Sequence, residues 1–197
     1  MSSDAPSGSS RARPSDELRS IALDQFSSVG YAGTSLQQIA DVAGYSKSSV
    51  LYHFASKEAL LDAVLTPAID ELQRVMAIWL SARPSEQSRA AFVESFVDFL
   101  LRYRLEVHTF INQGAPLEDV PVVARANALI ARLSDAVSAA DSSLETKLRF
   151  GIALGGAAYT LTAGLTYADS ALQPDDELRG ALIRIVSELL STVPPTR

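Results

Sequence analysis

Residues 34–58 read TSLQQIADVAGYSKSSVLYHFASKE, and this stretch decides the fold of the first part of the chain. Thr34 can cap a first helix, with Gln37 standing three residues on, where a capping box places Glu or Gln. One face of that helix carries apolar residues at helical spacing: Leu36, Ile39, Ala40 and Ala43. Gly44 accepts the left-handed conformation that ends a helix, and Ser46 can cap a second helix of about two turns.

The two predicted helices pack as a helix-turn-helix. Ala40 is small enough to let the second helix cross close to the first, Gly44 forms the turn, and the β-branched Val50 wedges between them. When such a helix enters the major groove of DNA, the residues at its N-terminal end face the base edges. Lys47 can then donate to guanine O6 or N7, and the serine hydroxyls beside it can donate or accept.

Short motifs at fixed spacing carry a family resemblance: Thr34-Ser35, Ile39-Ala40, Ala43-Gly44, Ser46-Lys47, Tyr52-His53-Phe54 and Ser56-Lys57-Glu58-Ala59-Leu60. Over about 45 residues they resemble the DNA-binding region of the TetR family of ligand-responsive transcriptional regulators. The resemblance implies phosphate contacts from four positions: Thr34, Tyr52, His53 and Lys57. The full set of expected DNA-contact residues is Thr34, Ser35, Tyr45, Ser46, Lys47, Ser48, Ser49, Tyr52, His53 and Lys57.

Charge is distributed unevenly along the 197 residues, whose formal net charge is −6. Residues 11–57 carry five basic and four acidic side chains, whereas the rest of the chain carries 12 basic and 19 acidic ones. A mildly basic head on an acidic body can orient a protein on DNA, although an acidic body is also an ordinary soluble surface. The chain has no Cys and no signal-peptide pattern, so we expect a reducing compartment, the cytoplasm.

The first 13 residues are rich in Ser, Gly, Pro and Ala and are expected to form a disordered tail. Arg11 and Arg13 belong either to a solvated tail or to an arm that reaches into a minor groove. A three-helix head with the helix-turn-helix is expected at residues 14–58. A larger bundle, for ligand binding and dimerisation, is expected at residues 59–197.

Apolar periodicity predicts helices throughout the chain and no strand, so the expected fold is all-α with about nine helices. The helix after Ser56 joins head to body and contains Pro67. Proline lacks the N–H that would bond to the carbonyl of Ala63, so this helix should kink or break there.

Residues 150–168 form a stretch of 19 residues without a charge, which is close to transmembrane length. Its glycines, alanines and threonines make it weakly hydrophobic. A helix that is apolar on all sides also results when one face meets the core and the other meets a second subunit. We therefore expect a homodimer through this helix and the last one, as the TetR resemblance also implies. The expected interface residues are Gly151, Gly155, Ala158, Leu182, Ile185 and Leu189.

Aromatic residues are frequent in the predicted body. Most should be ordinary core, while a subset can line an apolar cavity with a few polar anchors. The resemblance implies such a cavity, since members of the family are typically released from DNA by a small molecule. The candidate ligand-binding residues are Trp79, Phe96, Phe99, Tyr103, Phe110, Asn112, Tyr159 and Thr162.

Enzyme signatures are absent from the sequence. There is no Gly-rich phosphate loop, no H-E-x-x-H and no G-x-S-x-G. Of the two histidines, His53 lies in the helix-turn-helix, and His108 is expected to be a packed or surface residue rather than a base or ligand. We expect no catalytic residues, no metal site and no cofactor.

The sequence therefore predicts a homodimeric transcriptional regulator, a repressor that a small apolar ligand releases from a palindromic operator. An activator, or a regulator without a ligand, is an alternative of the same kind. An all-α ligand-binding or adaptor protein with a non-functional DNA-binding head is an alternative of another class. The presence of Lys47, Tyr52, His53 and Lys57 in the motif argues against that last alternative.

Overall fold

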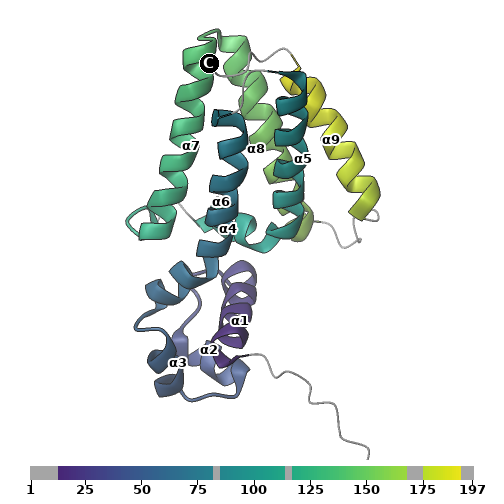
Figure 1. Cartoon of the computed structure of the whole chain (residues 1–197). Coiled ribbons are helices and arrows are strands. Elements are labelled where there is room, and N and C mark those ends of the chain that lie inside the picture. Colours follow the sequence, from purple (N-terminus) through teal and green to yellow (C-terminus); the bar gives the residue numbers. More distant parts are fainter. Residues whose placement is uncertain (1–12, 82–84, 114–116, 168–174, 192–197) are drawn as a thin grey trace, which may run out of the picture.

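The protein is built from α-helices packed as a small head on a larger body (Figure 1). The structure, a computed structural model, describes residues 13–81, 85–113, 117–167 and 175–191. Within these ranges it contains nine helices: α1 Pro14–Ser28, α2 Leu36–Ala43, α3 Lys47–His53, α4 Lys57–Ser81, α5 Glu86–Arg102, α6 Arg104–Gln113, α7 Pro121–Ala140, α8 Leu144–Tyr167 and α9 Asp175–Leu190. The all-α expectation is confirmed, and the expected disordered tail lies outside the described residues apart from Arg13.

The head consists of α1, α2 and α3 together with the first turns of α4. Its interior is apolar and fully buried, with Leu18, Phe26, Ile39, Val50 and Leu60 at 0% exposure. Val50 lies inside this core, so the predicted wedge between the two motif helices is present. Burial of apolar surface, at about 25 cal/mol per Å², is the main favourable contribution to the folding of the head.

The turns of the motif follow from local side-chain chemistry. Gly44 adopts φ +70° and ends α2, and the Ser46 hydroxyl accepts the Ser49 amide at 3.1 Å to start α3. The predicted cap of α2 is wrong by one residue. Ser35 is the N-cap and forms a capping box with Gln38, whereas Thr34 is buried. The Thr34 hydroxyl instead donates to the Gly30 carbonyl at 2.8 Å.

Helix α4 joins the head to the body without a break. The Ser56 hydroxyl accepts the Ala59 amide at 3.1 Å at its start, as predicted for a cap. The helix continues through Pro67, whose ring is exposed to solvent. The helix is therefore not broken at Pro67, and the other expected outcome, a kink, stays a prediction. A proline on the solvent face leaves the freed carbonyl of Ala63 in a position that water can reach, which lowers the cost of keeping the helix continuous.

In the body, α5 and α7 pack against α4, and α9 packs against α5 and α8. Aromatic rings form its centre, where Trp79 lies 4.9 Å from Phe92 and 5.8 Å from Phe150 between ring centroids. Ion pairs at the surface tie the outer helices down: Arg179 of α9 to Asp98 of α5, and Arg125 of α7 to Asp70 of α4. Among the described residues, no helix is long and apolar enough to cross a membrane.

The short helix α6 lies at the junction of the two parts. It packs against α1 of the head and against α4, α5 and α8 of the body. This position makes α6 a second connection between head and body beside α4.

Candidate functional site

The outer face of α3 presents polar and aromatic side chains to solvent. Lys47, Ser48, Leu51 and Tyr52 are exposed, and Tyr52 retains 86% of its accessible surface. These positions follow the i, i+1, i+4, i+5 spacing of one helical face, opposite the buried Val50. Tyr52 therefore points away from the head rather than packing beneath α3, and its side chain is accessible to a binding partner of this face.

The chemistry of this face suits recognition of base edges. Lys47 supplies an ammonium donor at the N-terminal end, and the Ser48 hydroxyl lies 2.9 Å from the Ser46 hydroxyl. Leu51, an exposed aliphatic residue four positions after Lys47, can contact a thymine methyl group. Our sequence interpretation missed Leu51, although its helical spacing from Lys47 was the available signal.

Tyr52 and His53 lie together at the end of α3. Their rings meet edge to face with centroids 5.3 Å apart, and both side chains are exposed. A hydroxyl and an imidazole in this position can donate to phosphate oxygens, which fix the register of a protein on DNA.

The remaining predicted DNA contacts differ in how accessible they are. Ser46 is exposed, and Ser49 is half-buried beside it. Ser35 is exposed at the start of α2, where its hydroxyl accepts the Gln38 amide at 3.2 Å. Tyr45 is half-buried, and its hydroxyl donates to Glu17 of α1 at 3.0 Å. The Thr34 side chain is 2% exposed, so at the start of α2 a hydroxyl contact to phosphate is left to Ser35.

Lys57 is tied into the head. Its ammonium group donates to the carbonyls of Tyr31 and Thr34, at 2.9 Å each, and lies 4.2 Å from the centre of the Tyr31 ring. Two of its three protons are thereby used within the protein. A phosphate contact from Lys57 would have to use the third proton.

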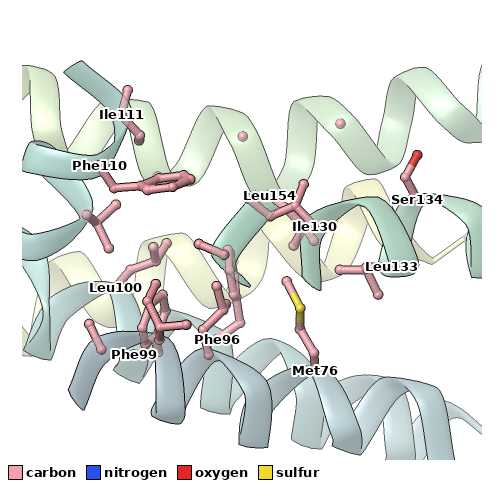
Figure 2. Close-up of a pocket in the computed structure, with 18 of the residues that line it drawn as sticks. Met76, Phe96, Phe99, Leu100, Phe110, Ile111, Ile130, Leu133, Ser134 and Leu154 are labelled. Atoms are coloured by element: carbon pink, nitrogen blue, oxygen red, sulfur yellow. The ribbon is translucent and has the colours of Figure 1, made fainter. Parts of the chain in front are cut away.

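A cavity of about 400 Å³ lies in the body between α4, α5, α6, α7 and α8 (Figure 2). Its lining is almost entirely apolar and includes Met76, Phe96, Phe99, Leu100, Phe110, Ile111, Ile130, Leu133 and Leu154. In Figure 2 the cavity extends from Phe110 and Ile111 at one end to Leu133 and Ser134 at the other. Its size and lining are those of a site for a small apolar molecule.

Three side chains bring polar groups to the cavity: Glu106, Ser134 and Lys147. Burial raises the pKa of Glu106, and a hydrogen bond from its own backbone amide opposes this shift in part. Lining residues exposed to solvent lie on α6, α7 and α8, namely Ile111, Ile130, Ser134, Lys147, Gly151 and Gly155. The cavity is therefore open to solvent between these helices.

The predicted ligand-binding residues separate into two groups. Phe96, Phe99 and Phe110 line the cavity. The other five lie elsewhere: Trp79 in the aromatic core, Tyr103 against Phe99, Asn112 and Tyr159 on the surface, and Thr162 buried with its hydroxyl bonded to the Tyr159 carbonyl. Glu106 was missed, because a single acidic residue in a helix carries no signal of burial.

The predicted interface residues also have mixed positions. Gly151, Gly155 and Ala158 lie on the cavity side of α8, Leu182 is buried in the core, and Leu189 is half-buried. Ile185 of α9 is 56% exposed, and a stripe along α8 is exposed as well: Leu144, Leu148, Ile152 and Tyr159. This stripe, rather than the glycines alone, forms the open apolar surface of α8.

Residues 18–64, which cover most of the head, match the model for "Bacterial regulatory proteins, tetR family". This description agrees with the expectation that the chain is not an enzyme. Among characterised proteins, the transcriptional regulator RutR of Escherichia coli is 37% identical over 117 residues, which cover 59% of this chain and 51% of RutR. The chain thus spans about half the length of that relative.

Two further similarities extend over nearly the whole chain. The transcriptional activator FasR of Mycolicibacterium smegmatis is 29% identical over 194 residues, covering 93% of this chain and 88% of FasR. The structure of the ketosteroid transcriptional regulator KstR2 of Mycobacterium tuberculosis superposes with a TM-score of 0.66 at 16% identity, covering 95% of this chain and 97% of that one. At that identity the likeness to KstR2 is one of fold.

Proposed function

Since the chain belongs to the TetR family of bacterial regulatory proteins, we propose that it is a DNA-binding transcriptional regulator that an apolar small molecule releases from its operator. The observation that carries this proposal is the exposed face of α3, where Lys47, Ser48, Leu51 and Tyr52 project from a helix-turn-helix. A protein that binds chromosomal DNA in a bacterium must lie in the cytoplasm, so we propose this localisation.

Lys47, Ser48 and Leu51 are assigned to base edges in the major groove. Tyr52, His53 and Ser35 are assigned to phosphates on either side of it. This division follows from the geometry of a recognition helix, whose N-terminal residues reach deepest into the groove.

The proposed effector is an elongated molecule that is mostly hydrocarbon and carries one polar group. The lining of the cavity supports this class, because a charged ligand would lose its hydration among Phe96, Leu100 and Leu154 without a matching set of partners. The Glu106 carboxyl group can accept a hydrogen bond from a ligand hydroxyl, or donate one to a ligand carbonyl when it is protonated. Relatives of this chain include both a repressor and an activator by name, and we assign this protein to repression.

A homodimer completes the proposal. The exposed stripe of α8, defined above, and Ile185 of α9 form an apolar surface that a second copy would cover. Two-fold symmetry would place the two α3 helices one DNA turn apart, about 34–36 Å, or wider if the grooves are opened, and the operator would then be palindromic. Residues 14–58 would serve as the DNA-binding unit and residues 59–197 as the ligand-binding and dimerisation unit.

Selection of binding sites from random double-stranded DNA tests the proposal directly. We expect the purified protein to enrich a two-fold symmetric sequence with half-sites about one helical turn apart. A neutral apolar fluorophore, 1-N-phenylnaphthylamine, should bind the cavity and quench or shift the fluorescence of Trp79, whose ring lies 5.8 Å from the cavity residue Phe150. Failure to enrich any sequence would overturn the DNA-binding proposal, and failure of the probe to bind would overturn the cavity proposal.

A further inference from the structure

One side chain of α6 joins the body to the head through hydrogen bonds to the main chain. Gln113 is the last residue of α6, and its Nε2 donates to the Phe26 carbonyl at 2.7 Å. Its Oε1 accepts the N–H of Tyr31. The amide therefore satisfies one acceptor and one donor of the segment that connects α1 to α2.

Both main-chain groups lie where the helix pattern has stopped. Phe26 is in the last turn of α1, and Gly30, with φ +95°, turns the chain away from the helix. Carbonyls in the last turn of a helix lack a partner within the helix and need one from outside. Gln113 supplies that partner. Its side-chain amide also lies beside Gly30, 3.7 Å from where a Cβ atom on Gly30 would stand.

From Tyr31 the contacts lead to the start of the DNA-binding motif. The Tyr31 ring contacts both the Phe26 ring, at a centroid distance of 5.3 Å, and the Lys57 ammonium group, at 4.2 Å. Lys57 in turn holds the carbonyls of Tyr31 and Thr34. Ser35, the cap of α2, follows directly. The segment 29–34 is thus held by α6 on one side and by α4 on the other.

The other end of this connection is the cavity. Val107, Phe110 and Ile111 of α6 line it, and Ile111 is only two residues before Gln113. A molecule that enters the cavity and displaces these side chains can shift the ten-residue helix that carries them. Gln113 moves with that helix.

We propose that Gln113 is the coupling residue that transmits occupation of the cavity to the segment 29–34, and through it to α2 and α3. The proposal rests on the proposed function and names how its ligand acts. A ligand alters DNA binding only by as much as it favours one conformation over the other. The two hydrogen bonds of Gln113 are the contacts whose making or breaking distinguishes the two conformations.

Two variants at Gln113 and one control separate this role from a general loss of structure. Gln113→Leu keeps the size of the side chain and removes both hydrogen bonds. Gln113→Glu keeps an acceptor for the Tyr31 amide but removes the donor to Phe26. Asn112→Leu is the matched control, because Asn112 is the adjacent, exposed amide and donates to the His108 carbonyl of its own helix.

The experiment uses the full chain with 1-N-phenylnaphthylamine as the probe. Hydrogen exchange of the peptide covering residues 29–36 is measured with and without the probe, and probe affinity is measured by fluorescence. In the wild type and in Asn112→Leu, the probe should change exchange of this peptide by about fivefold or more. In Gln113→Leu the probe should bind as well, within about threefold, yet change that exchange by less than about twofold.

Each outcome decides the matter. Gln113→Glu should respond less than the wild type, because its second carboxylate oxygen would face the Phe26 carbonyl, where neither atom can donate. An equal response to the probe in the wild type and Gln113→Leu would overturn the coupling role, as would a wild type whose head does not respond to bound probe. Neither result would count against the proposed function, which is tested separately by DNA binding and by probe binding. If the probe did not bind the wild type, the cavity proposal and the coupling proposal would fail together.

Discussion

Replacement of Lys57 by Met should destabilise the head by about 2 kcal/mol. The ammonium group makes two hydrogen bonds to carbonyls, at 2.9 Å each, and one contact with the Tyr31 ring at 4.2 Å. A hydrogen bond to a charged group is worth about 1.5 kcal/mol at the low end, and a cation–π contact at a partly exposed site about 0.5 kcal/mol. Because Lys57 is only half-buried and water can reach the freed carbonyls, we expect somewhat more than half of the sum to be lost.

Urea denaturation followed by circular dichroism measures this loss at a fixed protein concentration. With a denaturant dependence of about 2.5 kcal/mol per molar, a loss of ~2 kcal/mol lowers the midpoint by about 0.8 M. Lys147→Met is the control, since it removes the same charge from an exposed position of the body and should shift the midpoint by under about 0.2 M. Equal midpoints for Lys57→Met and Lys147→Met would refute the role assigned to the carbonyl contacts.

The salt dependence of DNA binding by Lys57→Met shows whether Lys57 contacts a DNA phosphate or only stabilises the head. If the third proton of Lys57 reaches a phosphate, the slope of log affinity against log salt falls by about 0.9 for each subunit. If Lys57 only shapes the head, the affinity falls while the slope stays that of the wild type.

Three further predictions concern the body. Ile152→Asp places a charge in the exposed stripe of α8 and should make the protein monomeric in sedimentation at micromolar concentration. Val29→Asp, at an equally exposed position of the head, should leave the dimer intact. If Ile152→Asp were still a dimer, this stripe would be excluded as the dimer interface. Glu106→Gln should unfold at a higher temperature than the wild type at pH 7, because burial raises the pKa of Glu106 and disfavours its charged form in the folded state. The difference in unfolding temperature should vanish as the pH falls below 4.5. A difference that did not change with pH would contradict this explanation. Arg179→Met should lower the stability slightly at pH 7, because the guanidinium holds the pKa of the exposed Asp98 below its usual value. This loss should fade as the pH falls below 3.8, and a loss that persists at lower pH would point to packing instead.

The head was predictable because its determinants are local. Gly44, Ser46 and Ser56 end or start helices through their own backbone or side chain, and the structure places all three as predicted. Thr34 and Ser35 are both good caps by sequence. Only the tertiary structure decides between them, because the Thr34 hydroxyl is taken by carbonyls at the end of α1.

The cavity and the junction could be predicted only in outline. Apolar periodicity marks which residues are buried, but it does not say whether a buried ring borders a cavity, as Phe96 does, or fills the core, as Trp79 does. The contacts of Gln113 join residues 82 and 87 positions apart, and a polar residue at the end of a short helix gives no sign of a distant partner. Such contacts depend on how helices pack, which the spacing of side chains along one helix does not specify.

The most direct test of the central claim, that the exposed face of α3 reads DNA, is to titrate Lys47→Ala against the selected operator and a scrambled duplex at several salt concentrations. We predict that Lys47→Ala loses about 1–3 kcal/mol of its preference for the operator, at one or two base positions. Lys147→Ala, which removes the same charge from the body, should retain the wild-type preference. An unchanged preference in Lys47→Ala, or an equal loss in Lys147→Ala, would contradict the assignment of α3 as the reading helix.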